Sequence, residues 1–173
     1  MIEHNVMDAI HGIIVHQTGG STAASALSSY LNKGANGAHL LVDKDGTVYQ
    51  TASFLRQTWH VGKLRSRCLA EHRCSPKEIK ELTRFNPKAE NQREAKKVVP
   101  DRYPSNTDAI GIELVGRSDA HDLYEPVTAA QNRALAWLVA EIRDTYCIML
   151  SEVFRHPTVS RKTESEASTA RWE

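Results

Sequence analysis

Two short apolar segments constrain the fold of this chain more than any other feature of its sequence. Residues 12–16 (GIIVH) and residues 109–115 (AIGIELV) are apolar and rich in β-branched side chains, which predicts buried strands. A histidine, His16, ends the first segment, and a glutamate, Glu113, interrupts the second. Burying a carboxylate is unfavourable unless it is paired or hydrogen-bonded. Glu113 therefore needs a specific role, either in a functional site or in an ion pair at the sheet edge.

Two helices are predicted to accompany these strands. Residues 21–32 form the first, with Ser21 as its cap and Gly34 as its stop. Thr128 and Gln131 are the two ends of a capping box that begins a long amphipathic helix. An amphipathic helix buries one apolar face, so we expect both helices to pack against a sheet.

Further strands complete the predicted sheet. Residues 38–51 contain a hairpin with its turn at Asp45 and Gly46, and residues 54–61 are expected to form an extended edge. A short segment around Val153 leads to the next histidine. Strands interspersed with flanking helices predict an α/β domain with a central mixed β-sheet. The length of 173 residues fits a single domain over residues 1–173.

A basic insertion, residues 63–105, interrupts this pattern. It carries twelve Lys or Arg against six Asp or Glu, whereas the whole chain has a net charge of only +1. Within it, Ser75, Pro76 and Glu78 provide a cap, a first-turn proline and a capping-box glutamate for a helix. Such a block suits an anionic polymer, and a solvated surface insertion is an equal alternative. It lacks the interleaved aromatic residues of a nucleic-acid platform, so no nucleic-acid partner is expected.

The cysteines and the hydropathy exclude several classes of protein. Three cysteines are an odd number, which argues against a disulfide framework. Cys68 and Cys74 flank His72, but three ligands are fewer than the four of a structural zinc site. We favour solvated loop residues, or a bridge formed in an oxidising compartment. Cys147 lies in an apolar stretch and is expected to be a buried thiol.

No membrane span or secretory signal is expected. The longest apolar run, residues 134–140, is far shorter than the roughly 20 residues that a membrane span needs. The first ten residues, MIEHNVMDAI, lack a basic region followed by an apolar stretch. We therefore expect the chain to be made in the cytoplasm without a signal peptide.

Two histidines and a loop that is rich in charge carry the chemistry. His16 ends a buried strand, and His156 opens a loop that also contains Lys162, Glu164 and Glu166. Two neutral imidazoles and one carboxylate make a three-ligand zinc site with an open fourth position for water. Taken alone, a histidine after a strand is more often a hydrogen-bonded structural residue than a ligand.

Five segments together resemble the zinc-dependent amidase family that includes phage lysozyme-type amidases, bacterial muropeptide amidases and animal peptidoglycan recognition proteins. The resemblance covers about residues 11–172. In the order of the family, the five segments are IIVHQTGG, GAHLLVDKDGTVYQ, WHVG, NTDAIGIELVG and HPTVSRKTE. It implies that His16 and His156 bind Zn²⁺, that Lys162 stabilises an oxyanion, and that Glu113 handles the proton of a water.

The sequence differs from the family pattern at the position of the third zinc ligand. The family places an Asp or Cys two residues after the lysine, usually followed by Pro-Gly. Here Glu164 stands at that position, followed by Ser165 and Glu166. We favour Glu164 by register and keep Glu166 as the alternate, because alternation in an extended loop would put both on the side of Lys162.

The family also implies a substrate groove. Trp59 and His60, the WH pair, are expected to line it, and His39 is a further substrate-binding candidate. Core packing is the alternative role for Trp59, and a surface position is the alternative for His60. Some phage members place a tyrosine before the HxxI strand, where this chain has Ala38, which leaves Glu113 as the proton carrier.

The implied function is hydrolysis of the amide bond between N-acetylmuramic acid and L-alanine in peptidoglycan or muropeptides. A recognition module that binds peptidoglycan without cutting it is one alternative, since such proteins often lose the third ligand. An amidase that binds a regulatory protein through the basic insertion is another. The setting stays open between a recycling enzyme, a phage lysin and an effector delivered to a periplasm, and the last implies an immunity protein as partner.

Overall fold

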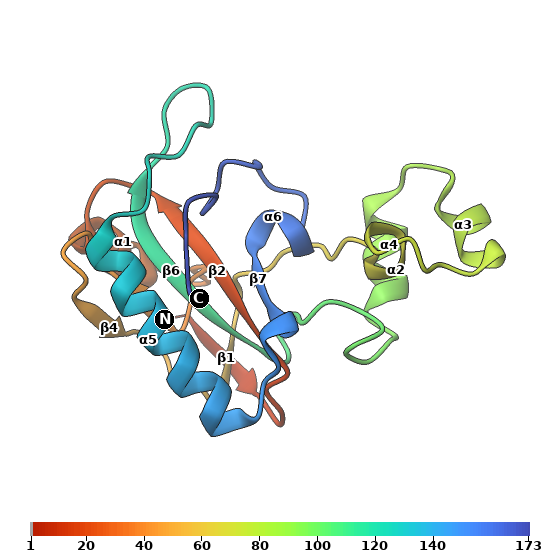
Figure 1. Cartoon of the computed structure of the whole chain (residues 1–173), viewed down its shortest axis with the longest axis horizontal. Helices are drawn as coiled ribbons and strands as arrows, with labels where there is room; N and C mark the ends of the chain where they lie inside the picture. Colours follow the sequence, from red (N-terminus) through yellow and green to blue (C-terminus); the bar gives the residue numbers. More distant parts are fainter. Residues whose placement is uncertain (1) are drawn as a thin grey trace.

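A five-stranded mixed sheet forms the centre of the protein, whose computed structural model describes residues 2–173 (Figure 1). Its strand order is β4-β3-β6-β2-β7, in which β4 is antiparallel to β3 and all other neighbours are parallel. The strands are β2 (Gly12–Gly19), β3 (Leu40–Val42), β4 (Val48–Gln50), β6 (Ala109–Arg117) and β7 (Val153–Arg155). The two apolar segments are the adjacent central strands β2 and β6, so the predicted fold class is confirmed.

The helices that were predicted from their caps are present. Helix α1 (Ala23–Tyr30) begins one residue later than expected, because Thr22 and not Ser21 is its cap. Helix α5 (Ala129–Tyr146) begins at the capping box of Thr128 and Gln131. A 3-10 turn η1 (Leu150–Glu152) and a short helix α6 (His156–Val159) precede and follow β7. Within residues 2–173, no helix has both the length and the apolar character that crossing a membrane requires.

A small antiparallel pair lies outside the main sheet. It consists of β1 (Glu3–Val6) and β5 (Arg56–Thr58), joined at Glu3 with Thr58 and at Val6 with Arg56. The expected extended edge over residues 54–61 is therefore only partly strand. The antiparallel hairpin of β3 and β4 agrees with the hairpin predicted over residues 38–51.

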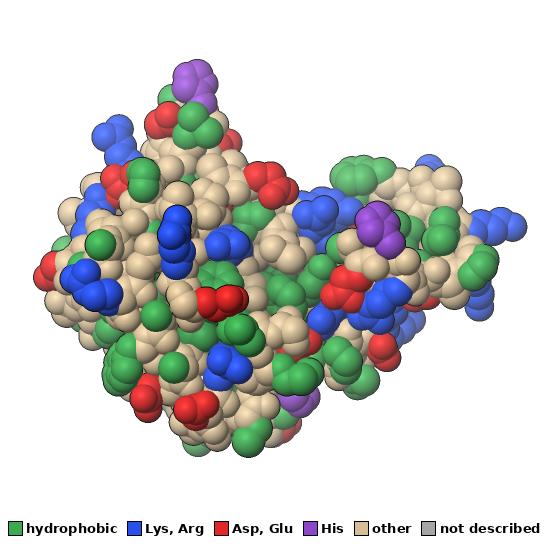
Figure 2. Space-filling view, viewed as in Figure 1, with side chains coloured by type: hydrophobic (Ala, Val, Ile, Leu, Met, Phe, Trp, Pro, Cys, Tyr) green, Lys and Arg blue, Asp and Glu red, His purple; other side chains and the backbone are tan. Residues whose placement is uncertain are grey.

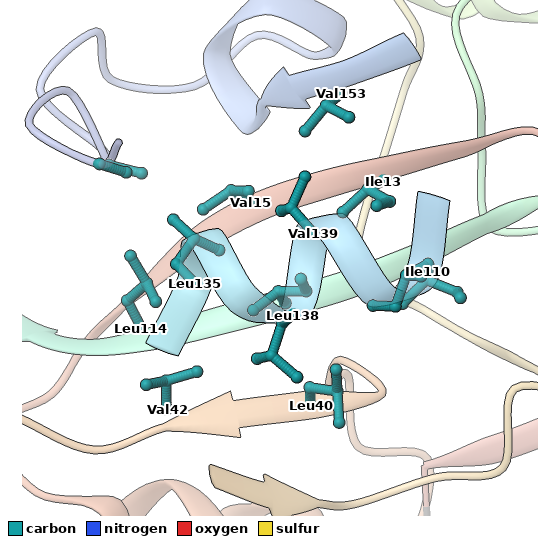
Figure 3. Close-up of a cluster of buried hydrophobic side chains, with 14 of the residues drawn as sticks. Ile13, Val15, Leu40, Val42, Ile110, Leu114, Leu135, Leu138, Val139 and Val153 are labelled. Carbon is teal, nitrogen blue, oxygen red and sulfur yellow. The ribbon is translucent and has the colours of Figure 1, made fainter. Parts of the chain in front are cut away.

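The two faces of the sheet bury different clusters because successive side chains of a strand point to opposite faces. On one face, α5 packs over the central strands (Figure 3), and the cluster includes Ile13, Val15, Leu40, Val42, Ile110, Leu114, Leu135, Leu138 and Val139. On the other face, Ile14 packs against Val61, Leu64 and Val159. His16 shares the face of Ile14 by the same alternation. In the register of the sheet, His16 lies directly opposite Glu113.

The basic insertion forms a helical arm that projects from the body (Figure 1). We call residues 63–105 the arm; its helices are α2 (Arg67–Ala70), α3 (Pro76–Leu82) and α4 (Pro87–Glu94). The capping box of Ser75 and Glu78 begins α3 as predicted, yet no residue of α3 is buried. Ion pairs and hydrogen bonds therefore stabilise the arm more than an apolar core does.

The cysteines give one agreement and one correction. Cys68 and Cys74 form a disulfide that closes the turn between α2 and α3, which is one of the two outcomes that we favoured. Cys147 is exposed, so the expectation of a buried thiol is wrong. It ends α5 in the left-handed conformation, with φ 54°, and this turn of the backbone directs its side chain to solvent.

Candidate active site

A cleft of about 640 Å³ opens at the carboxyl ends of the parallel strands β2 and β6. Ligands commonly bind outside these ends in open α/β sheets. Its lining comes from β2, α1, β6, α6 and several connecting segments, and it includes His16, Tyr30, Trp59, His60, Glu113, His156, Lys162 and Glu166. The fold thus collects residues that lie up to 150 positions apart in the sequence.

Three buried donors converge at the base of this cleft. One ligand atom each from His16, His156 and Glu166 lies within 4.8 Å of the other two. Oε1 of Glu166 is 2.9 Å from Nδ1 of His156 and 3.6 Å from Nδ1 of His16. Two imidazoles and a carboxylate are the donor set of catalytic zinc sites.

A backbone carbonyl orients the imidazole of His156. Nε2 of His156 is 2.8 Å from the carbonyl oxygen of Val61, which can only accept, so Nε2 carries the hydrogen. In the neutral ring, the lone pair of Nδ1 then faces the carboxylate of Glu166. This arrangement is repulsive by itself and becomes favourable when a cation lies between the two groups.

His60 fixes the other imidazole through a relay. Its Nε2 donates to the carbonyl of Ala109 at 3.3 Å, which leaves Nδ1 to accept from Nε2 of His16 at 2.9 Å. Nδ1 of His16 therefore faces Glu166 with its lone pair. Gly111 makes room for the relay, because a Cβ there would lie 2.8 Å from the His60 ring. A second hydrogen bond of this kind is how proteins orient metal-binding histidines.

The electrostatics place His16 and Glu166 in the forms that bind a metal. Burial, followed by the neighbouring His156, lowers the pKa of His16 to about 4, so its imidazole is neutral near pH 7. Burial opposes ionisation of Glu166, but the neighbouring His156 and His16 outweigh burial and lower the pKa of Glu166 to about 2. A neutral imidazole and an ionised carboxylate fit a zinc ion.

The structure brings Glu166 to the two histidines and directs Glu164 away from them. The side chain of Glu164 is 86% exposed, and its Oε1 lies 4.0 Å from Nη1 of Arg65. The family register, two residues after Lys162, favoured Glu164, and an extended loop would have put both glutamates on the side of Lys162. Residues 164–169 form turns instead. Ser165 anchors these turns by donating from its hydroxyl to the carbonyl of Asp122. Because the chain reverses direction in these turns, the side chain of Glu166 points toward His16 and His156.

Buried polar contacts hold the turn that carries Glu166. Oε1 of Gln17 accepts from the backbone N–H of Ala167 at 3.1 Å, which links strand β2 to the turn. The guanidinium of Arg155 donates to the carbonyls of Ala167 and Ala170, at 3.0 and 2.7 Å. Ala167 has a φ of 53°, and these bonds stabilise that uncommon conformation.

Glu113 faces the cleft from β6 and is bonded to a tyrosine that was not predicted as a site residue. The hydroxyl of Tyr30, on α1, donates to Oε2 of Glu113. Burial raises the pKa of Glu113, and this hydrogen bond partly opposes the rise. Tyr30 lies 83 residues away from Glu113 in the sequence. In the sequence alone, Tyr30 is explained as one residue of the apolar face of α1, so nothing there marks it as a functional residue. Only the packing of α1 against β6 shows the pairing.

The remaining predicted site residues take different positions. Lys162 and Trp59 line the cleft, and Trp59 is 47% exposed while its ring stacks on His4 with 3.7 Å between ring centroids. His60 also borders the cleft, although its hydrogen bonds point to His16 and the backbone. His39 is fully buried and does not line the cleft, so it cannot contact a substrate.

His39 has a structural role instead. Its Nε2 donates to the carbonyl of Arg56 at 2.8 Å, and its Nδ1 accepts from the backbone N–H of Gly111 at 3.0 Å. The ring thereby joins β5 to β6. His39, just before β3, is therefore a strand-linking residue and not a contact with substrate.

Comparisons with known proteins agree with this geometry. The family model of N-acetylmuramoyl-L-alanine amidases matches residues 6–167. No curated protein sequence matches the chain. Among solved structures, the fold is similar to AmpDH3 of Pseudomonas aeruginosa, with a TM-score of 0.62 and 18% identity over 92% of this chain and 56% of that one.

Two other amidases have a similar fold. The amidase LysC of Clostridium intestinale aligns with a TM-score of 0.55 and 18% identity over 95% of this chain and 82% of its own. AmiD of E. coli, solved in complex with anhydro-N-acetylmuramic acid-L-Ala-D-gamma-Glu-L-Lys, aligns with a TM-score of 0.58 and 19% identity over 90% of this chain and 52% of its own. The family match covers the strands, the cleft and the turn that carries Glu166. The chain belongs to the N-acetylmuramoyl-L-alanine amidase family.

Proposed function

We propose that this protein is a zinc-dependent hydrolase of the amide bond between N-acetylmuramic acid and L-alanine. The observation that carries the proposal is the convergence of His16, His156 and Glu166 below an open cleft, beside Glu113 and Lys162. The family supports the substrate class, and the oriented imidazoles support the metal. A bound zinc ion lowers the pKa of a water from 15.7 to about 7 and polarises an amide carbonyl.

Glu113 is the proposed proton carrier. It lies in register with His16, on the cleft side of β6, where it can accept a proton from the attacking water. The same carboxyl then returns the proton to the leaving nitrogen of L-alanine. The hydroxyl of Tyr30 fixes the orientation of this carboxylate, because it donates to one oxygen and leaves the other available.

Lys162 is the proposed electrostatic stabiliser. Its ammonium group borders the cleft and, within residues 2–173, forms no ion pair, so it is available to a developing negative charge. A single well-placed donor of this kind contributes about 3–4 kcal/mol to the transition state. Trp59 offers an exposed aromatic surface at the rim for the sugar or the peptide.

A recognition module without activity is the weaker alternative. Loss of the third zinc ligand would favour a recognition module, and the sequence indicated such a loss because Glu164 stands where the family has Asp or Cys. Glu166 supplies a carboxylate at the required place, so the set of three donors is complete. Three metal donors with Glu113 and Lys162 beside them favour a catalytic role over binding alone.

The disulfide supports a site of action in an oxidising compartment. Cys68 and Cys74 are bonded in the arm, and such bonds persist mainly outside the cytoplasm. We propose that the protein acts on cell walls after cell lysis or after delivery to a periplasm. Delivery into a competitor would require an immunity protein in the producing cell.

Metal removal is expected to abolish hydrolysis reversibly. Protein purified without added metal should contain one zinc per chain, since His16, His156 and Glu166 provide three ligands. Chelation should remove both the zinc and the release of L-alanine peptides, and added zinc should restore both. Elemental analysis beside an activity assay makes the measurement. Full activity in the zinc-free protein would rule out the proposed mechanism.

Replacing His60 with alanine is expected to weaken zinc binding by roughly 10–100-fold, the usual effect of removing a partner of a metal ligand. The reason is that His16 loses the acceptor that orients its ring. His60→Gln keeps an acceptor and should lose less. His121→Ala, at an exposed histidine outside the cleft, is the matched control. Competition with a chromophoric chelator measures the affinities, and equal zinc affinity in all three variants would contradict the relay.

A further inference from the structure

The arm presents its excess positive charge to solvent. All six of its acidic residues form ion pairs: Glu71, Glu78, Glu81, Glu90, Glu94 and Asp101. Six exposed cations of the arm form no ion pair with any residue between 2 and 173: Lys63, Lys77, Lys80, Arg84, Lys88 and Lys96. Blue side chains accordingly mark several points of the arm in Figure 2. Five of these acidic side chains pair with cations of the arm itself, and Glu90 pairs with Arg161 beside it, so the six unpaired cations remain available to an external anion.

Two grooves connect the cleft to the arm. A groove of about 600 Å³ shares Lys162 and Thr163 with the cleft and is further lined by Arg65 and Arg161. A smaller groove of about 280 Å³ shares Arg161 with it and extends along the arm. The lining of the smaller groove includes Leu69, Arg84, Phe85 and Arg93. Together the two grooves form a track that leads away from the catalytic residues. Its lining is basic and aromatic, and its three glutamates, Glu164, Glu81 and Glu90, each pair with an arginine that also lines it.

An exposed aromatic ring lies on this track. Phe85 is 77% exposed, and the guanidinium of Arg161 lies 5.2 Å from its ring centroid. Arg161 also pairs with Glu90 of α4, which fixes the arm beside the loop that contains Lys162. An open aromatic face beside cations suits a ligand with apolar ring faces and negative charges, such as a glycan with acidic peptides.

We propose that the arm and its track bind uncut peptidoglycan, through the carboxylates of stem peptides next to the one being cut. The inference rests on the proposed function and specifies its substrate as polymer. A soluble muropeptide has one stem, which occupies the cleft, so it does not reach the arm. A polymer places further acidic stems along the track. The arm therefore raises the local concentration of enzyme on the wall and leaves the chemistry unchanged.

A charge-removal variant of the full-length protein separates the arm from the catalytic residues. The test variant is Lys80→Gln, Arg84→Gln and Lys88→Gln, at three exposed positions of the arm that are neither in the cleft nor in ion pairs, and of which Arg84 lines the smaller groove. The matched control is Arg56→Gln, Arg133→Gln and Arg171→Gln, which removes three exposed charges from the body. The probes are insoluble peptidoglycan stripped of phosphate-containing wall polymers, and a soluble N-acetylmuramic acid tripeptide.

The arm variant is expected to bind the insoluble polymer roughly tenfold more weakly at low salt, as three exposed charge contacts would give. The turnover of the polymer by the arm variant should fall together with its binding. Its turnover of the soluble tripeptide should stay within about twofold of that of the unchanged protein. High salt should remove the difference, because exposed charges are screened. The body variant should behave like the unchanged protein on both substrates.

Three results would overturn the inference: unchanged polymer binding, equal losses on polymer and tripeptide, or an equal loss in the body variant. Preferential binding of the arm to double-stranded DNA over the stripped polymer would overturn it as well. Co-sedimentation with the polymer does not require catalysis. If the unchanged protein cuts neither substrate, the proposed function fails, and the sedimentation result still decides whether the arm binds the wall.

Discussion

Glu166→Ala is expected to lower zinc affinity by more than about 100-fold, a larger effect than the loss of a hydrogen-bonding partner. The reason is that Glu166 is the carboxylate whose oxygen lies 2.9 Å from His156 and 3.6 Å from His16. Two imidazoles without it leave two open positions and weak retention of the metal. Hydrolysis of a soluble muropeptide should fall in proportion to the zinc that is lost.

Glu164→Ala is the matched control for this experiment. It removes the same side chain two residues away, from an 86% exposed position near Arg65, so zinc affinity and activity should stay close to those of the unchanged protein. Zinc competition assays and thermal melts on both variants make the comparison. A larger loss of zinc in Glu164→Ala would return the third ligand to the family register. Equal affinity in both variants would mean that the site has only two protein ligands.

The parts of the site that could be predicted are those that regular structure positions. His16 and Glu113 lie on the central strands, where the period of two fixes the face of each side chain. In the sheet the two apolar segments pair in parallel, in a register that puts His16 opposite Glu113. The caps of α3 and α5 were predictable for a similar reason, because each depends on residues three apart.

The parts that could not be predicted depend on contacts between distant segments. The position of Glu166, and not Glu164, beside the two histidines follows from turns that Ser165, Gln17 and Arg155 stabilise, and no local pattern encodes those bonds. An extended loop was the wrong assumption for residues 164–169. In the same way, the burial of His39 and the pairing of Tyr30 with Glu113 appear only after helix and sheet have packed.

The arm shows a further limit of composition. Its positive excess is visible in the sequence, but which charges are free is a property of the folded arm. Glu78 and Glu94 both bind the ammonium group of Lys97, and Glu71 binds Arg67 and Arg73. The acidic residues of the insertion are therefore all paired, five of them within the arm and Glu90 with Arg161. A count of charges alone leaves the solvated surface and the polymer site equally supported.

Glu113→Gln is expected to lower turnover by about 10²–10⁴-fold, the scale of general acid–base catalysis, while zinc content and substrate affinity stay unchanged. The amide keeps the shape of the side chain and the hydrogen bond from Tyr30, but it cannot accept a proton at neutral pH. Because Glu113 is not among the three converging donors, the metal should be retained. Steady-state kinetics on a soluble muropeptide with zinc analysis of the same sample make the measurement.

Tyr30→Phe separates the proton role of Glu113 from a structural one. This variant removes only the hydroxyl that donates to the carboxylate, so turnover should fall less than in Glu113→Gln. Burial raises the pKa of Glu113 and the tyrosine opposes that rise, so the acid limb of the activity profile should move to higher pH in Tyr30→Phe. An unfolded or zinc-free Glu113→Gln protein would instead make the glutamate a structural partner. An unmoved acid limb in Tyr30→Phe would assign the proton transfer to another group in the cleft.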